Sequence, residues 1–259
     1  MKKISMFLLV TVLAVVFTNC DIQEYDYKLE VTETRTWSID NITQIDAITK
    51  NGNVSVTASL DTIISALITR SCRGEDSTDA AKYLENVVVT DNVSEGKLNL
   101  KADMPNSNGR NYQANFEITT PQTTYLDVNT TNGDVSLDGL IAGAKLETTN
   151  GDISAENHRG GIDARTTNGK VDCNLTGLNS TESAIVSTTN GNVILYLPSD
   201  VSARFEGSTT NGDVTITGFS SIQYDINENT HKKGKIGSGP DYATVTLSST
   251  NGNVTIRSR

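Results

Sequence analysis

Apolar and polar residues alternate along most of this chain, in short runs that Asn-Gly pairs separate. After Gly133, apolar residues stand two and four positions on, at Val135 and Leu137, and residues 150–155 repeat the pattern as Asn-Gly-Asp-Ile-Ser-Ala. A period of two is typical of a β-strand with one buried face. The pattern therefore predicts a body built mainly from short strands.

The Asn-Gly pairs recur at a nearly constant spacing. From Asn132 the successive spacings are 18, 18, 22, 21 and 40 residues, and Leu146, Ile162 and Ile185 mark a second strand before the next pair. A meander of two-residue hairpins would not require near-identical text in every repeat. A solenoid does require it, because each coil stacks on its copy. The sequence therefore predicts an all-β fold, a single-stranded parallel β-helix (β-solenoid).

The sequence predicts the handedness of this β-helix less directly than it predicts the fold. Left-handed β-helices built on hexapeptide repeats place an aliphatic residue every six positions. Six positions after Val135 stands Ile141, but six positions after Ile153 stands Arg159. Because parallel crossovers are right-handed in most proteins, a right-handed helix is favoured.

Each Asn-Gly pair is expected to form a corner of the solenoid. Glycine supplies the positive φ of a tight corner, and stacked Asn side chains can hydrogen-bond along the stack. We therefore assign the pairs a structural role rather than a ligand site. The predicted corner residues are Asn51, Gly52, Asn132, Gly133, Asn150, Gly151, Asn168, Gly169, Asn190, Gly191, Asn211, Gly212, Asn251 and Gly252.

The amino-terminal half contains one repeat and one helix signal. Residues 45–54 resemble residues 162–171, which predicts an early coil. A short α-helix is expected after it, with Ser77 or Thr78 as its N-cap and Asn86 at its end. The helix would be an insertion or would cap an open end of the solenoid, since terminal units of repeat proteins need a cover.

The widest gap between Asn-Gly pairs predicts the longest loop, at residues 220–241, and one irregular turn. This loop carries the basic cluster Lys232, Lys233 and Lys235 with His231. Binding groups concentrate on long loops, but a solvated loop is the simpler interpretation. The following Gly-Ser-Gly at residues 237–239 fits neither glycine signature for phosphate binding.

The first residues are typical of an export signal. Lys2 and Lys3 precede an apolar run at residues 4–17, and polar sequence begins after Cys20. The run is short for a bilayer span, which takes about 20 residues. Cys20 resembles the lipobox cysteine of bacterial lipoproteins, whose thiol takes a diacylglyceryl group before the chain is cut ahead of it. The residues that precede Cys20 match the usual lipobox only in part.

These features divide the chain into four segments. They are a signal peptide at residues 1–19, a lipid-anchored tether at 20–36, an N-terminal β region with the early coil and helix at 37–125, and the repeat solenoid at 126–259. The expected location is the cell envelope, exported and lipid-anchored, at the outer membrane on its periplasmic or surface face.

Charge narrows the choice of partners. The chain has 31 acidic and 21 basic residues, for a net charge of −10. Cleavage before Cys20 would remove Lys2 and Lys3 and make the mature chain more acidic still. Nucleic acid is therefore excluded, because phosphate binding needs clustered Lys and Arg, and so is a polybasic membrane patch. The membrane is expected as a partner only through the lipid anchor.

The remaining Cys and His residues offer little chemistry. Export makes a disulfide between Cys72 and Cys173 possible, but the sequence leaves the pairing open. Cys173 takes the place of Leu137 in its coil, which favours a small buried core residue. His158 and His231 are far apart, without partners at metal-ligand spacing.

An acidic row raises the alternative of calcium binding. Asp134 and Asp152 recur one coil apart and could stack. Lys170 and Asn192 take the next two places, so a solvated face is the favoured interpretation. A glycosidase would need two carboxylates across a cleft, and short regular coils leave few loops to form one. We therefore expect no catalytic residue, metal or cofactor, and no enzyme activity.

The chain resembles a known family at its motifs. The Thr-Asn-Gly-Asp-Val text of residues 131–135, the early helix, the Thr-Thr-Pro junction at 119–121 and the closing residues 237–254 are similar to the bacterial putative-adhesin domains of unknown function (DUF4097-like), also called β-strand-repeat proteins. The resemblance covers residues 37–259. It implies a β-strand-repeat fold and supplies no catalytic residues.

The leading functional hypothesis is a non-catalytic interaction or adhesion module of the cell envelope, with an unknown protein or glycan partner. One alternative is a carbohydrate-active β-helix enzyme. A second alternative, which rests on family association alone, is a periplasmic component of an envelope-stress or signalling system.

The lipid anchor gives a direct prediction. Replacing Cys20 with Ser removes the acylated thiol, and acyl chains supply the membrane affinity of such a protein. We expect the variant to move from the membrane pellet to the soluble fraction when cells are fractionated. An unchanged membrane pellet would exclude Cys20 as the anchor.

Overall fold

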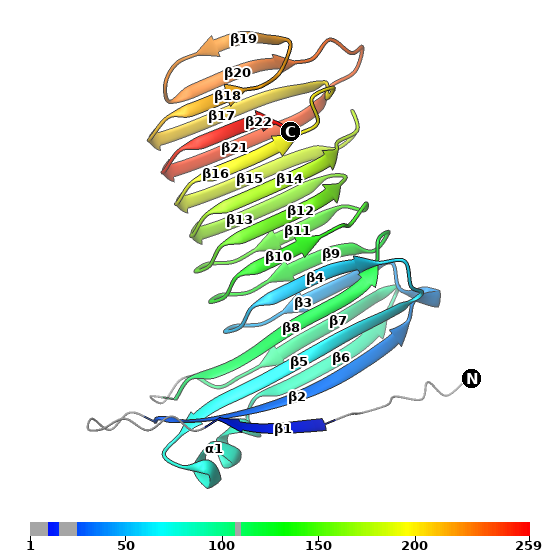
Figure 1. Ribbon diagram of the computed structural model, residues 1–259, viewed down its shortest axis with the longest axis vertical. Coiled ribbons are helices and arrows are strands. Elements are labelled where there is room, and N and C mark those ends of the chain that lie inside the picture. The colour runs from blue at the N-terminus through cyan, green and yellow to red at the C-terminus, as the bar shows by residue number, and fades with distance from the viewer. Residues whose placement is uncertain (1–9, 16–24, 107–109) are drawn as a thin grey trace.

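The computed structural model describes residues 10–15, 25–106 and 110–259. Within them the chain forms two sheets of 11 strands each, which enclose one continuous hydrophobic core (Figure 1). The fold is all-β and solenoid-like along most of its length, as the sequence predicted. The right-handed coil stays a prediction. The predicted anchor Cys20 lies outside the described residues.

The strands of each sheet follow one another in a fixed spatial order. Sheet A contains β1 (Val10–Val15), β2 (Tyr27–Ser38), β5 (Ile63–Gly74), β8 (Tyr112–Pro121), β4 (Val54–Ser59), β10 (Val135–Asp138), β12 (Ile153–Arg159), β14 (Val171–Gly177), β16 (Val193–Leu197), β22 (Val254–Ser258) and β18 (Val214–Thr217). Sheet B contains β19 (Ile222–Asn227), β20 (His231–Ile236), β17 (Ala203–Asn211), β21 (Ala243–Asn251), β15 (Ser183–Asn190), β13 (Ile162–Asn168), β11 (Ala144–Glu147), β9 (Tyr125–Asn129), β3 (Gln44–Ile48), β7 (Lys97–Asp103) and β6 (Val88–Ser94).

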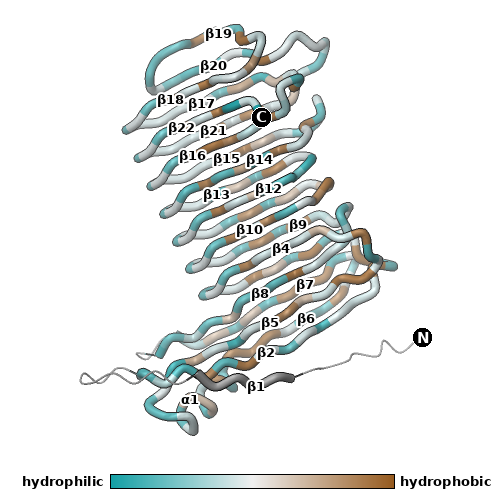
Figure 2. Tube along the Cα trace, viewed as in Figure 1, coloured by the Kyte–Doolittle hydropathy of each residue, from teal (hydrophilic) through white to brown (hydrophobic). Residues whose placement is uncertain are grey.

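Each regular coil gives one strand to each sheet, and successive coils pair in parallel register. Val135 pairs with Ile153, which in turn pairs with Val171. All three side chains are buried, because every second residue of a strand faces the space between the sheets. Figure 2 shows the result, with hydrophobic residues along the strands and hydrophilic residues at the corners. The second strand that Ile185 marks is β15, and its buried residues include the neighbours Ala184 and Val186.

The amino-terminal end extends the two sheets with antiparallel strands. The early coil is β3 and β4, in parallel contact with β9 and β10. Beyond it, β8 pairs antiparallel with β5, and β5 with β2. All twelve residues of β2 pair with β5, so residues 27–36 belong to the folded body. The tether predicted at 20–36 is therefore wrong for this part, because the Thr-rich alternation of β2 completes a sheet.

The carboxy-terminal end has an order that the repeat spacing did not predict. The last coil, β21 and β22, lies between the coil of β15 and β16 and the coil of β17 and β18. The expected loop at residues 220–241 contains the hairpin of β19 and β20, and β20 pairs antiparallel with β17. The hairpin supplies an antiparallel partner to the edge of the last parallel strand (Figure 1).

Helix α1 (Ser77–Leu84) lies at the amino-terminal end, between β5 and β6 in sequence. Asp76 is its N-cap and accepts a hydrogen bond from the backbone N of Asp79 at 2.8 Å, so the expected caps Ser77 and Thr78 are wrong. The helix packs against β5 and β2 and buries Ala80 and Leu84. No helix among the described residues has the length and apolar character to cross a bilayer.

Arg110 connects the helix to the start of the body. Its guanidinium lies 3.6 Å from the ring centroid of Tyr83 and 4.2 Å from that of Tyr25. It also forms an ion pair with Asp79, which lowers the pKa of that carboxyl. Cation–π contacts of this kind are stronger when the cation is shielded from water, and Arg110 is 7% exposed. The start of the described body is thereby held against α1.

Cys72 and Cys173 are both free and buried. Burial raises the pKa of each thiol, so neither is poised to react as a thiolate. Cys173 lies in register between Ala155 and Leu195, in the core position that the repeat predicted for it.

The buried His158 gives a pH-dependent prediction. Its Nε2 lies 3.2 Å from the Gly161 carbonyl oxygen, while Nδ1 has no hydrogen-bond partner in the described structure. Burial lowers the pKa of His158 below its ordinary value of about 6.5. As pH falls below about 6.5 the unfolded chain takes up a proton that the native chain refuses, so stability falls by up to about 1.4 kcal/mol per pH unit. Its neighbour in register is Leu175, and we expect His158→Leu to flatten this dependence.

Urea unfolding at pH 7.0 and pH 5.5 measures the difference. The loss of stability between the two pH values should be larger in the unsubstituted protein than in His158→Leu. An identical loss in both proteins would show that other groups cause the pH dependence.

Candidate functional site

The Asn-Gly corners form the most repeated constellation of polar side chains in the structure. Nδ2 of Asn150 donates to Oδ1 of Asn132 at 2.8 Å, and Nδ2 of Asn168 donates to Oδ1 of Asn150 at 2.8 Å. The ladder runs, in spatial order, through Asn51, Asn132, Asn150, Asn168, Asn190, Asn251 and Asn211. Each side chain thus bonds to its own copy in the neighbouring coil.

A second ladder lies inside the corner. The Thr two positions before Asn is buried and bonds to the previous coil. Oγ1 of Thr166 donates to the Gly151 carbonyl oxygen at 2.9 Å, and Oγ1 of Thr188 donates to that of Gly169 at 2.9 Å. In the last coil Ser249 takes the same place. These hydroxyls satisfy backbone carbonyls that would otherwise be buried without a partner.

A third ladder explains the acidic row. The backbone N of Asp152 donates to Oδ1 of Asp134 at 2.8 Å, and the backbone N of Lys170 donates to Oδ1 of Asp152 at 2.7 Å. Lys170 has no side-chain acceptor and interrupts the ladder, which resumes from Asn192 to Asn253. The described residues hold no group of three or more His, Cys, Asp or Glu placed to bind a metal ion. At the other coils the Asp or Asn after glycine serves as a hydrogen-bond acceptor for the backbone of the neighbouring coil.

Glycine is required at each corner by space, and at every corner except that of Gly133 also by a positive φ. Gly191 has a φ of 151°, and a Cβ there would lie 2.0 Å from the Gly169 carbonyl oxygen. That oxygen is the one that accepts the hydroxyl of Thr188. A side chain at this position would therefore push the two coils apart and disrupt the hydrogen bond from the Thr188 hydroxyl. The sequence did show the row of Asp134 and Asp152, but not its role as an acceptor for backbone N–H groups. The buried Thr was missed, although the repeated motif Thr-Thr-Asn-Gly-Asp contains it.

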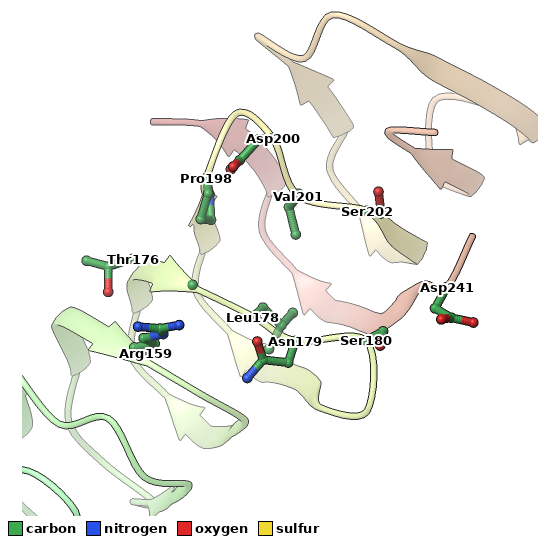
Figure 3. Close-up of a pocket in the computed structure, with 11 residues that line it drawn as sticks. Arg159, Thr176, Leu178, Asn179, Ser180, Pro198, Asp200, Val201, Ser202 and Asp241 are labelled. Carbon is green, nitrogen blue, oxygen red and sulfur yellow. The ribbon is translucent and has the colours of Figure 1, made fainter. Parts of the chain in front are cut away.

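Longer turns on the opposite side of the coils enclose a polar pocket of about 350 Å³. Two consecutive turns, at residues 178–182 and 198–202, form its walls, and Arg159 contributes from the end of β12 (Figure 3). Its lining residues are Arg159, Thr176, Gly177, Leu178, Asn179, Ser180, Pro198, Asp200, Val201, Ser202 and Asp241. One cation, two carboxylates and an amide make it a hydrogen-bonding surface that is open to water.

The basic cluster lies on β20, in the segment that the sequence predicted as a loop. Some of its residues are paired with polar side chains and one is not. Nζ of Lys233 lies 3.0 Å from Glu206, and Nε2 of His231 lies 3.1 Å from the same carboxylate. These contacts, that of Lys233 first, lower the pKa of Glu206. Lys232 donates to Asn227. Lys235 instead stands over an aromatic ring, and no carboxylate partner is found for it among the described residues.

The glycine loop at residues 237–239 has a structural contact. The backbone N of Gly239 donates to Oγ of Ser202 at 3.0 Å. A Cβ at Gly237 would lie 2.4 Å from the Val201 carbonyl oxygen. The loop therefore fits closely against the start of β17, where glycine leaves room for the neighbouring chain.

Comparison with known proteins gives a family and a fold. The chain matches the family model described as Toastrack DUF4097 over residues 21–257. A putative cell adhesion protein from Clostridium sporogenes has 12% sequence identity and a TM-score of 0.51, over 88% of this chain and 99% of that one. A putative adhesin from Bacteroides fragilis has 13% identity and a TM-score of 0.45, over 88% and 97% of the two chains. The comparison with curated proteins gave no match.

The Asn ladder gives a prediction on stability. Asn150 bonds to both neighbours, whereas Asn51 stands at the end of the ladder and accepts only from Asn132. We expect Asn150→Ala to cost about 1 kcal/mol of unfolding free energy and Asn51→Ala about half as much, because the side chains are partly exposed and water replaces some of the lost bonds. The denaturant midpoint measures both losses. Equal losses at the two positions would contradict a ladder that ends at Asn51.

Proposed function

We propose a non-catalytic role in cell-envelope adhesion for this chain, which belongs to the Toastrack DUF4097 family, as its sequence predicted. The observation that carries the proposal is the use of the repeated polar residues. The Thr, Asn, Gly and Asp positions of the corners bond coil to coil, so the motif that dominates the sequence supports a stiff body. What this body offers to a partner is the two broad outer faces of its sheets.

Two further observations support the proposal. The pocket at the long turns is open and polar, which suits reversible binding better than chemistry that must exclude water. The solved structure with a TM-score of 0.51 is described as a putative cell adhesion protein. Its low identity to this chain supports the fold alone, so the role itself rests on the geometry above.

A lipid anchor at Cys20 would fit the arrangement of the body. After β1 the described chain resumes at Tyr25, and the Arg110 contact holds that residue at the amino-terminal end of the sheets. Five residues of chain span at most about 18 Å. An anchored body would therefore stand with its amino-terminal end near the lipid and its carboxy-terminal hairpin away from it.

An envelope-capture experiment tests the proposed function. The Cys20→Ser protein, purified without its signal peptide and immobilised, should retain material from envelope extracts in a saturable way. The same protein should release no reducing ends from envelope glycans. Turnover of a glycan that is lost on mutating Asp200 and Asp241 would replace adhesion by hydrolysis, and an absence of saturable capture would contradict adhesion.

A further inference from the structure

One outward-facing row of residues crosses the middle of sheet B. The register of the strands places Ser183, Thr244, Arg204 and Lys235 side by side in this order. Gly161 and Gly143, the residues just before β13 and β11, continue the row to Tyr125 at the start of β9. The next residue along the chain after each of these three is buried, at Leu126, Ala144 and Ile162, so the row itself faces solvent. The strands can be followed from β9 to β20 in Figure 1.

An aromatic side chain forms one end of this row. Tyr125 is 39% exposed, and its ring lies over the neighbouring strand, where a Cβ at Gly143 would be 3.0 Å from its Cε2 atom. A hollow of about 210 Å³ continues from the ring across Gly161 to Ser183 and Ile185. Asp163 lines the same hollow. An exposed ring beside a shallow hollow with polar groups is suited to a ligand that has both apolar faces and hydroxyl groups.

A pair of cations forms the other end. Arg204 and Lys235 stand directly opposite each other on antiparallel strands, an arrangement of like charges that is destabilising. The guanidinium of Arg204 lies 5.2 Å and Nζ of Lys235 5.5 Å from the ring centroid of Tyr242. Neither cation forms a salt bridge with a described residue, whereas Lys233, two positions earlier on β20, is paired with Glu206.

The two ends suggest one extended ligand. Five strand spacings separate β9 from β17, which is about 24 Å at roughly 4.8 Å per strand. A nucleic acid would place a phosphate at every step along the row, whereas the unpaired cations of the described row, Arg204 and Lys235, stand only at its β17–β20 end. Every strand of the row, from β9 to β20, has a paired neighbour on both sides, so none offers an edge to which a peptide strand could pair.

We propose that this row, from Tyr125 to Arg204 and Lys235, binds a linear acidic polysaccharide. A sugar ring packs on Tyr125, the chain follows the hollow over Gly143, Gly161 and Ser183, and its carboxylates reach the two cations. The inference rests on the proposed adhesion function and names the chemical class of its partner. Arg204 and Lys235, which have no carboxylate partner among the described residues, provide charge complementarity to the carboxylates of the polysaccharide.

Binding of linear uronate polymers tests the inference on the purified Cys20→Ser protein. The probes are polygalacturonate, alginate and hyaluronate. Methyl-esterified polygalacturonate serves as the uncharged control for polygalacturonate. Biolayer interferometry should show at least one acidic polymer binding, and polygalacturonate, if it is the one bound, should bind at least fivefold more tightly than its ester. Replacing both cations, in Arg204→Gln with Lys235→Gln, should weaken the acidic polymer about tenfold, since exposed ion pairs contribute up to about 1 kcal/mol each.

The aromatic end has its own variants. Tyr125→Ala should weaken binding about tenfold through loss of the packing ring, while Tyr125→Phe should keep it. Arg257→Gln and Tyr196→Ala are matched controls, because these two residues face outward from sheet A in mutual register. Unfolding midpoints show that each variant is folded.

The outcomes separate this inference from the proposed function. Binding lost in the sheet B variants and kept in the sheet A controls supports the row. If none of the three acidic polymers binds, or if the sheet B variants bind like the unsubstituted protein, the inference is wrong. If the inference is wrong but envelope material is still captured in a saturable way, the proposed adhesion function stays valid and its partner is a different molecule.

Discussion

The structure depends on the vertical register between like positions of successive coils. At each corner the Asn side chain bonds to the Asn of the next coil, and a buried hydroxyl donates to the glycine carbonyl one coil away. At most coils the residue after glycine also accepts a hydrogen bond from the backbone N of its counterpart. The close approach of Gly191 to the Gly169 carbonyl leaves no room for a side chain. Because the corner determines where each strand starts, it also determines which residues face the core. A slip of one residue would turn every buried side chain outward.

The repeated text made this part of the fold predictable from sequence. The period, the alternation after glycine and the early copy at residues 45–54 all reflect contacts between identical positions, so they leave a visible pattern. The N-cap at Asp76 was missed because Ser77 and Thr78 are equally good caps by type, and only the helix register distinguishes them. The antiparallel strands β2 and β5 were missed or misplaced because they pair with each other rather than with a copy.

The outer row of sheet B could not be predicted from sequence. Its members come from residues 125 to 244, one from each strand or from the residue just before it. Nothing in the local text around Gly161 or Arg204 indicates that they share a row. Their proximity follows only from the position of the last coil, which places Thr244 between Ser183 and Arg204. The residues of such a site can be identified only from the register in which the strands pair, not from the sequence around each residue.

The position of the last coil also constrains how the chain acquires its structure. Strands β21 and β22 enter between coils that precede them in sequence, so β17 and β18 have no parallel neighbour until the final residues arrive. A chain that lacks its end would hold two stacks with unpaired strand edges, which are prone to associate with other chains. Completion of the body therefore depends on β21 and β22, which must insert between two coils that precede them in sequence.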